Sequence, residues 1–181
     1  KPLASLGVTP NQLTVLGLLI SLFAALNFLT WQINKERLLA GSIFILVSGI
    51  IDAIDGVLAR STGKVTKFGG FFDSVTDRYS DAAVLSGIIL GELCNPFIGL
   101  ATLVGTLMVS YTRSRAEAEG VKMAGVGLAE RAERMIFLAF CALLNYWWHM
   151  ALNYGVLILG ILAHFTVIQR GFYFKKEIEK D

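Results

Sequence analysis

The sequence predicts an all-α integral membrane protein, with six transmembrane helices around a polar cavity that faces the cytoplasm. Composition is the first reason, because 55% of the 181 residues are apolar and 17% are charged, whereas soluble domains average about 45–50% and about 25%. The second reason is that polar clusters divide the chain into apolar stretches of about 20 residues, the length with which a helix spans a bilayer. The third is a group of five aspartates within these stretches.

Each of the first three helices has a recognisable start signal. Thr9 is a suitable N-cap and Pro10 suits the first helical position, so the first helix begins at Pro10. The second helix follows the charged residues 35–37, and the third follows a short polar connection at 61–67. These helices are expected at about Pro10–Trp31, Leu38–Ala59 and Phe68–Leu90.

The last three helices are bounded by a turn, a polar connection and a charged tail. They are expected at about Phe97–Arg115, Leu128–Trp148 and Tyr154–Phe174, after a turn at Gly91–Pro96. The predicted organisation is a cytoplasmic N-terminal segment (1–9), a six-helix membrane domain (10–174) and a cytoplasmic tail (175–181). Because residue 1 is Lys and not an initiator Met, the N-terminal segment is expected to be truncated.

The distribution of basic residues predicts the orientation in the membrane. Lys and Arg gather in the second and fourth connections and at the C-terminal end, whereas the third and fifth connections contain none. Since cytoplasmic loops carry the excess of Lys and Arg, both termini and the polar cavity are expected in the cytoplasm. Trp31, Trp147 and Trp148 are expected in an aromatic belt at the opposite interface, with packing between helices as the alternative.

Cysteine content excludes a secreted disulfide scaffold, and the net charge gives no support for a nucleic-acid-binding protein. Cys94 and Cys141 lie 47 positions apart in apolar stretches, which favours buried thiols over a disulfide or a metal site. The formal net charge of +2 is far below the basic excess that nucleic-acid-binding proteins usually show.

The aspartates, Asp52, Asp55, Asp73, Asp77 and Asp81, lie on the second and third predicted helices. An ionisable residue at membrane depth costs about 2.5–3.5 kcal/mol on insertion scales, so the group requires a cation, a partner or water. Residues three or four apart share a helix face, and a short connection makes the two helices antiparallel neighbours. The two sets of carboxylates are therefore expected to meet roughly 7–15 Å below the cytoplasmic connection.

Converging carboxylates in a low dielectric repel one another unless a counter-charge is present. Their oxygens are hard ligands, and no Cys or His lies near them in the sequence, which favours Mg²⁺, Mn²⁺ or Ca²⁺ over zinc. Two divalent cations are the simplest ligands for this group of carboxylates, because paired metals clamp the attacking and leaving oxygens of a phosphoryl displacement. Gly56 and Gly69 leave room for a ligand close to the backbone, and Arg60 adds a fixed positive charge.

The spacing of these residues resembles a family signature, that of the CDP-alcohol phosphotransferases. The pattern is D-x₂-D-G-x₂-A-R-x₈-G-x₃-D-x₃-D, and it is matched at each position by Asp52, Asp55, Gly56, Ala59, Arg60, Gly69, Asp73 and Asp77. The resemblance implies a six-helix membrane core. It also implies transfer of a substituted phosphate group from a CDP-linked donor to an alcohol, by attack on the β-phosphate with release of CMP.

The resemblance also implies roles for the matched residues. Two divalent cations, Mg²⁺ or Mn²⁺, are expected on Asp52, Asp55, Asp73 and Asp77, with Asp77 also the base that activates the acceptor hydroxyl. The CDP moiety is expected against Asp55, Gly56, Ala59, Arg60 and Gly69. Asp81 lies outside the signature, and it either orients a ligand, pairs with an arginine such as Arg78, or packs as a polar group. A homodimer is a further expectation from the family.

Two arginine-rich elements, residues 110–115 (S-Y-T-R-S-R) and 127–134 (G-L-A-E-R-A-E-R), predict the acceptor. They resemble the branch of phosphatidylinositol-phosphate synthases and their archaeal ether-lipid counterparts, which implies inositol phosphate as acceptor and CDP-diacylglycerol or an ether-lipid equivalent as donor. Arg113, Arg131 and Arg170 then fall where contacts to the acceptor phosphate are expected. The alternative is that they belong to the cytoplasmic basic excess, with Glu130 and Glu133 in surface ion pairs.

Several alternatives remain open from the sequence. CDP-inositol, glycerol phosphate or serine could be a substrate of the same chemistry. Nine residues precede the first helix, where family members usually begin with an amphipathic segment, so the donor entrance is partly undefined. A membrane cation transporter is the alternative from another class, but it predicts acids spread through the membrane depth. A catalytically inactive structural protein is disfavoured by the complete set of aspartates.

Overall fold

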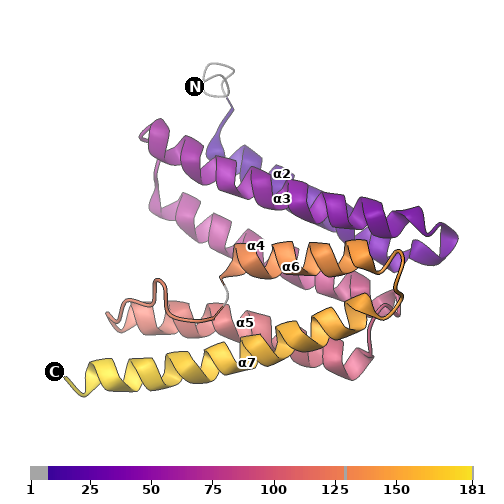
Figure 1. Cartoon of the computed structure of the whole chain (residues 1–181). Helices are drawn as coiled ribbons and strands as arrows, with labels where there is room; N and C mark the ends of the chain where they lie inside the picture. The colour runs from indigo at the N-terminus through magenta and orange to yellow at the C-terminus, as the bar shows by residue number, and fades with distance from the viewer. Residues whose placement is uncertain (1–7, 129, 181) are drawn as a thin grey trace.

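The computed structural model describes residues 8–128 and 130–180, and this part of the chain is all-helical (Figure 1). It contains six α-helices and one short 3₁₀ helix, η1 (Trp31–Ile33). The α-helices are α2 (Pro10–Leu29), α3 (Glu36–Ser61), α4 (Lys67–Leu90), α5 (Pro96–Ala118), α6 (Arg131–Leu144) and α7 (Ala151–Ile178). The prediction of an all-α protein is confirmed.

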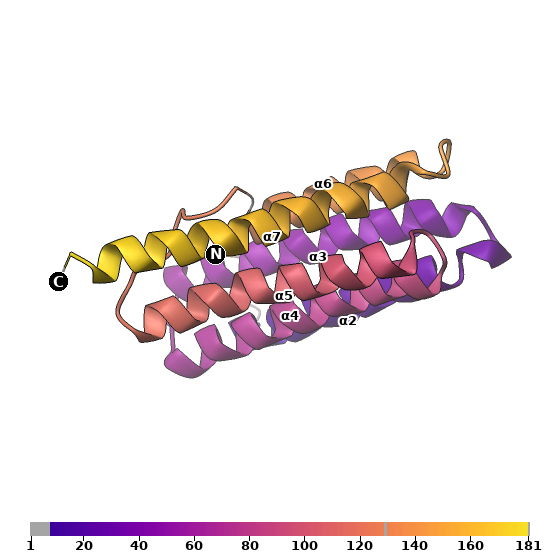
Figure 2. The same cartoon turned by 90° about the horizontal axis from the view of Figure 1, so that it is seen from below.

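The helices pack as a ring. In order around it, α2 contacts α3, α3 contacts α6, α6 contacts α7, α7 contacts α5, α5 contacts α4, and α4 contacts α2. Figure 2 shows α5 and α7 side by side along most of their length. The start of α2, the α3–α4 and α5–α6 connections and the end of α7 lie at one end of the bundle (left in Figure 1), which we call the site end. The arrangement leaves α3 and α4 facing each other, with α2 on one side and α6 on the other.

Helix starts follow the expected capping chemistry. The Thr9 side chain accepts a hydrogen bond from the Gln12 backbone N–H, and the Gln12 side chain caps Thr9 in return, which forms a capping box before Pro10. Thr66 caps α4 through one side-chain bond, because its hydroxyl accepts from the Gly69 backbone N–H at 2.9 Å. These caps set the start of α2 and α4, two of the helices that carry the site.

The fifth predicted helix is wrong at both ends, because α6 has only 14 residues instead of extending over 128–148. Its start is fixed by a capping box in which the backbone N–H of Glu130 donates to the Glu133 carboxylate at 2.9 Å. Its end is fixed by Asn145, whose buried side chain accepts from the Leu152 backbone N–H at 3.0 Å and so closes the turn into α7. The last helix is longer than predicted, since α7 continues through Ile178 into the segment expected as a tail.

The core lies mainly toward the end of the bundle opposite the site end. Its fully buried side chains include Phe28, Leu38, Leu85, Ile88 and Leu152. Gly87 allows α4 to approach α2, because a Cβ at this position would lie 2.4 Å from the Ala25 carbonyl oxygen. Cys94 and Cys141 are buried free thiols, as predicted.

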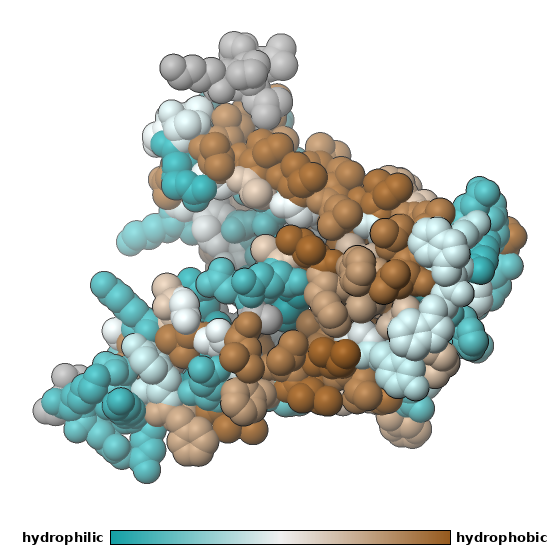
Figure 3. All heavy atoms as spheres, viewed as in Figure 1, coloured by the Kyte–Doolittle hydropathy of each residue, from teal (hydrophilic) through white to brown (hydrophobic). Residues whose placement is uncertain are grey.

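Length and composition make α2, α3 and α7 suitable to cross a membrane. Figure 3 shows apolar side chains over the middle of the bundle and polar side chains at both ends. The shortest helix, α6, is about 21 Å long, against a hydrocarbon core of about 30 Å. That α4, α5 and α6 also cross the membrane, giving six crossings in total, therefore remains a prediction.

Two of the tryptophans at the opposite end are accessible, as an aromatic belt requires. Trp147 is 71% exposed and Trp148 is 53% exposed, which argues against packing between helices for this pair. Trp31 is half-buried and donates from its indole Nε1 to the Gly91 carbonyl oxygen at 2.7 Å, so it also ties η1 to the end of α4.

Candidate active site

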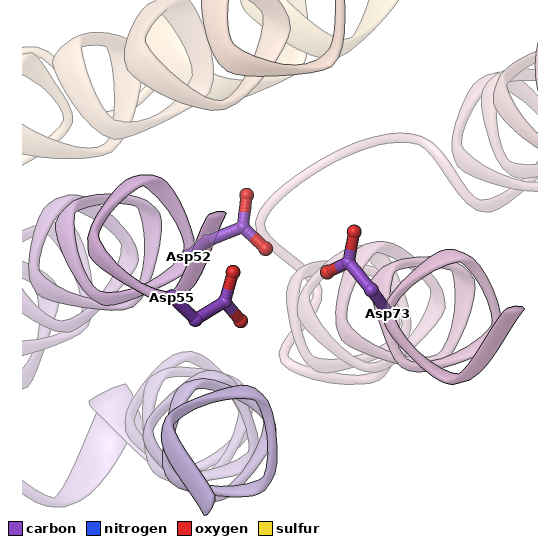
Figure 4. Close-up of side chains that lie close together, drawn as sticks. All are labelled: Asp52, Asp55 and Asp73. Carbon is purple, nitrogen blue, oxygen red and sulfur yellow. The ribbon is translucent and has the colours of Figure 1, made fainter. Parts of the chain in front are cut away.

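Three of the predicted metal ligands converge between α3 and α4. Oxygens of Asp52, Asp55 and Asp73 all lie within 4.8 Å of one another. Figure 4 shows the two carboxylates of α3 and the carboxylate of α4 pointing into the same space. Asp52 and Asp55 share one face of α3 because they are three residues apart. The antiparallel α4 returns Asp73 to the same level, as the spacing predicts.

A hydroxyl from α2 completes this cluster on one side. Thr14 Oγ1 donates to Asp55 Oδ2 at 2.6 Å, and both residues are buried, Asp55 being 5% exposed. The bond fixes one Asp55 oxygen and joins the first helix to the carboxylates. Sequence reasoning missed Thr14, because a single threonine within an apolar helix carries no signal of such a role.

The cluster has the chemistry of a divalent cation site. Oxygen ligands from several carboxylates are what Mg²⁺ and Mn²⁺ prefer. Asp73 Oδ1 is buried and makes no hydrogen bond within residues 8–128 and 130–180, so it is a free acceptor on a carboxylate of the cluster. An unsatisfied buried carboxylate oxygen is costly, and coordination to a cation would satisfy it. The residues present therefore fit the group that the sequence implied.

Asp77 is connected to the cluster through an arginine. Its Oδ1 lies 2.8 Å from Arg131 Nη1, and the same nitrogen donates to Asp52 Oδ2 at 3.0 Å. Arg131 is the first residue of α6 and approaches from the side opposite Thr14. The structure thus places Arg131, predicted from the sequence, inside the site, bridging carboxylates of α3 and α4.

Asp81 pairs with arginines of α6, and not with Arg78. Its Oδ1 accepts from Arg131 Nε at 3.0 Å, and its Oδ2 lies 3.9 Å from Arg134 Nη2. Arg78 instead lies 3.7 Å from Asp77 Oδ2. Of the alternatives for Asp81, arginine pairing is the one observed, with different partners. Arg134 was missed, although its position three residues after Arg131 on one helix face could have indicated it.

The residues expected to contact CDP line one cavity. A cavity of about 290 Å³ opens between α2, α3 and α4 at the site end. Its wall includes all five predicted residues, Asp55, Gly56, Ala59, Arg60 and Gly69, together with Asp73 of the cluster. A Cβ on Gly69 would lie 3.0 Å from the Thr66 hydroxyl that caps α4, so glycine keeps this wall clear.

Arg113 and Arg170 lie apart from the aspartates. Arg113 Nε donates to Glu117 at 2.9 Å on the exposed surface of α5. Arg170 is buried, and its guanidinium donates to the backbone carbonyls of Val126 (2.8 Å) and Val109. Arg170 therefore ties the α5–α6 connection to α5 and α7.

Comparison with known proteins identifies the family. A model of the CDP-alcohol phosphatidyltransferase family matches residues 7–168, so the chain belongs to this family and is a transferase. It is 48% identical over 179 residues to archaetidylinositol phosphate synthase of Pyrococcus horikoshii, a match that covers 99% of this chain and 90% of that protein. Phosphatidylinositol phosphate synthase of Mycobacterium tuberculosis is 33% identical over 180 residues, with 94% and 81% covered.

Solved structures give the same assignment. The Mycobacterium tuberculosis enzyme (PgsA1) with CDP-DAG bound superposes with a TM-score of 0.83 at 31% identity, covering 96% of this chain and 89% of that one. The same enzyme in complex with manganese and citrate also has a TM-score of 0.83, with 96% and 85% covered. The family resemblance inferred from the signature is confirmed, and the cation-transporter alternative loses its support.

The cation site can be tested directly with Asp73→Asn. We expect the affinity of the purified protein for Mn²⁺ to fall at least about tenfold, because the variant removes the negative charge of one carboxylate of the cluster. Isothermal titration in detergent measures the change. Glu119→Gln, which removes an exposed carboxylate paired with Arg115, is the matched control and should bind like the wild type. Unchanged affinity in Asp73→Asn would contradict the site.

Proposed function

We propose that this protein transfers a phosphatidyl-type group from a CDP-linked lipid to inositol phosphate and releases CMP. The observation that carries the proposal is the cavity lined by all five expected nucleotide residues together with Asp73, because a diphosphate in it would reach the carboxylate cluster. The names of the relatives support inositol phosphate as acceptor. The structure of PgsA1 with CDP-DAG supports a lipid-linked donor. We place the reaction at the cytoplasmic face and expect a homodimer.

Two divalent cations, Mg²⁺ or Mn²⁺, are proposed as cofactors. They would neutralise the diphosphate and stabilise the leaving phosphate. Asp52, Asp55, Asp73 and Asp77 are the proposed ligands, and Thr14 holds Asp55 in place through its hydrogen bond of 2.6 Å. The manganese complex of PgsA1 supports the choice of metal.

Asp77 is the proposed base. It lines a narrow space together with Asp52 and Arg131, and it is not among the residues that line the nucleotide cavity. We therefore assign the base to the acceptor and not to the leaving group. The guanidinium of Arg131 matches a phosphate, since its fork of donors binds two oxygens at once. Arg131 would hold the acceptor phosphate while Asp77 takes the hydroxyl proton.

Arg113 is the proposed outer contact to the acceptor phosphate, and Arg170, expected from the sequence to be a second contact, is proposed to support this site from behind. The ion pair of Arg113 with Glu117 is exposed, and such pairs contribute little, so the guanidinium is available to an anion. Arg170 holds the connection that leads to Arg131 and so supports the same phosphate site.

A second cavity favours a lipid donor over soluble CDP-inositol. It has a volume of about 390 Å³, and its polar end is formed by Asp52, Asp81 and Arg131. From there it runs between α3, α4 and α6 along apolar side chains that include Ile45, Val84, Met135 and Ile136. An apolar cavity that begins at the reacting groups suits a hydrocarbon chain.

A side chain that fills this cavity should lower turnover of lipid donors and leave turnover of soluble donors unchanged. Gly49 lines it, and a Cβ at this position would meet nothing within 4 Å, so the wall has room for a larger side chain there, such as Leu. We expect Gly49→Leu to lower turnover with long-chain CDP-diacylglycerol at least about fivefold and to spare a short-chain, water-soluble donor.

Gly171→Leu is the matched control, because a Cβ there also meets nothing within 4 Å and Gly171 lies outside the cavity. It should turn over both donors like the wild type. An equal loss on both donors in Gly49→Leu would show that the substitution damages the site without acting on a lipid chain.

A CMP-release assay tests the whole proposal. Purified protein with Mg²⁺ or Mn²⁺ is given lipid and soluble CDP donors against inositol phosphate, inositol, glycerol phosphate and serine. We expect CMP release with the lipid donor and inositol phosphate, and preferred use of another acceptor would overturn the acceptor assignment. Asp77→Asn should abolish CMP release while CDP-donor binding persists, because the base is lost and the nucleotide cavity is intact. Turnover in Asp77→Asn would remove Asp77 as the base.

A further inference from the structure

Arg131 lies between two sets of carboxylates. Its Nη1 edge faces Asp52 Oδ2 (3.0 Å) and Asp77 Oδ1 (2.8 Å), which are proposed metal ligands. Its Nε edge faces Asp81 Oδ1 at 3.0 Å. Asp81 is 4% exposed, stands outside the Asp52–Asp55–Asp73 cluster, and has Arg134 on its other oxygen. One edge of the guanidinium therefore contacts the site, and the other contacts a buried carboxylate behind it.

The contacts of the Nη1 edge occupy one oxygen on each of two proposed metal ligands, Asp52 and Asp77. A guanidinium cannot lose its proton in a protein, so it acts as a permanent positive charge on Asp52 and Asp77. A nitrogen at 2.8–3.0 Å from both oxygens takes the position between them. While this edge stays in place, its positive charge disfavours a cation on either oxygen.

We infer that Arg131 and a divalent cation compete for Asp52 and Asp77, and that Asp81 is a positioning residue that retains Arg131 beside the site once it is displaced. The inference rests on the proposed function and deepens it. With Nε held by Asp81, the displaced Nη edge stays next to the reacting groups and becomes available to an anion, the phosphate of the acceptor. Arg131 thereby couples the two ligands, because cation binding releases the donors that the acceptor phosphate needs.

Asp81 is suited to this role by its burial and its second partner. A buried carboxylate that keeps two arginines nearby is held in one position, and it cannot move into the cation cluster without leaving both. Loss of its charge would leave Arg131 with Asp52 and Asp77 as its remaining carboxylate partners among the ion pairs of the described chain. The guanidinium would then compete more strongly with the cation.

The test is a double-mutant cycle read out as Mn²⁺ affinity, with no substrate present. Arg131→Met should raise the affinity at least about threefold, because it removes a competing charge. Asp81→Asn should lower it at least about fivefold when Arg131 is present, and by less than about twofold in the Arg131→Met background. Glu119→Gln, made in both backgrounds, controls for loss of a carboxylate at the site end.

Equal effects of Asp81→Asn in both backgrounds, or a lower affinity in Arg131→Met, would overturn the inference. If Arg131→Met does not fold, the inference is tested on the wild-type protein by measuring how Mn²⁺ and inorganic phosphate affect each other's binding. Mn²⁺ should tighten phosphate binding, and phosphate should tighten Mn²⁺ binding by the same factor, as linkage requires. Arg131→Lys, which keeps the charge and loses the fork, should weaken that coupling, and unchanged coupling would overturn the inference.

Failure of this inference and failure of the proposed function give different results. Wild-type protein that binds Mn²⁺ but releases no CMP with any acceptor would contradict the proposed function and leave the cycle interpretable. Normal CMP release together with equal effects of Asp81→Asn in both backgrounds would contradict this inference alone.

Discussion

The structure depends on balancing the negative charge of five aspartates gathered at one end of an apolar bundle. Carboxylates in such surroundings are costly unless a positive charge, a hydrogen bond or water compensates each of them. The chain supplies part of that compensation from two directions, with Thr14 on α2 and Arg131 on α6. The free oxygen of Asp73 is left for a ligand.

The ring of helices explains why these groups meet. Helices α3 and α4 face each other, with α2 and α6 on either side. The carboxylates between them therefore have α2 and the nucleotide cavity on one side, and α6 with Arg131 on the other. The apolar cavity beside α6 extends from the same point along the bundle. In the proposed function, the nucleotide lies in the cavity between α2, α3 and α4, and the hydrocarbon chain lies in the cavity beside α6. Such an arrangement fits a transferase that must hold two substrates at once.

Much of this site was predictable because its residues lie close together in sequence. Helical spacing alone puts Asp52 beside Asp55, and the short connection returns Asp73 to their level. The contacts of Thr14 with Asp55 and of Arg131 with Asp52 span 41 and 79 positions, so they depend on helix packing that periodicity does not encode. The end of α6 was missed for a related reason. The apolar run continues past Asn145, and the turn there depends on a hydrogen bond to Leu152 of the next helix.

The central proposal is that Asp52, Asp55, Asp73 and Asp77 form one site for paired divalent cations. Electron paramagnetic resonance of the Mn²⁺-saturated protein tests it most directly, because metals about 3.5–4 Å apart couple magnetically. The account predicts two Mn²⁺ per chain with a spin-coupled spectrum, and loss of the coupling in Asp73→Asn. A single uncoupled ion per chain, or a coupled pair that survives Asp73→Asn, would contradict it.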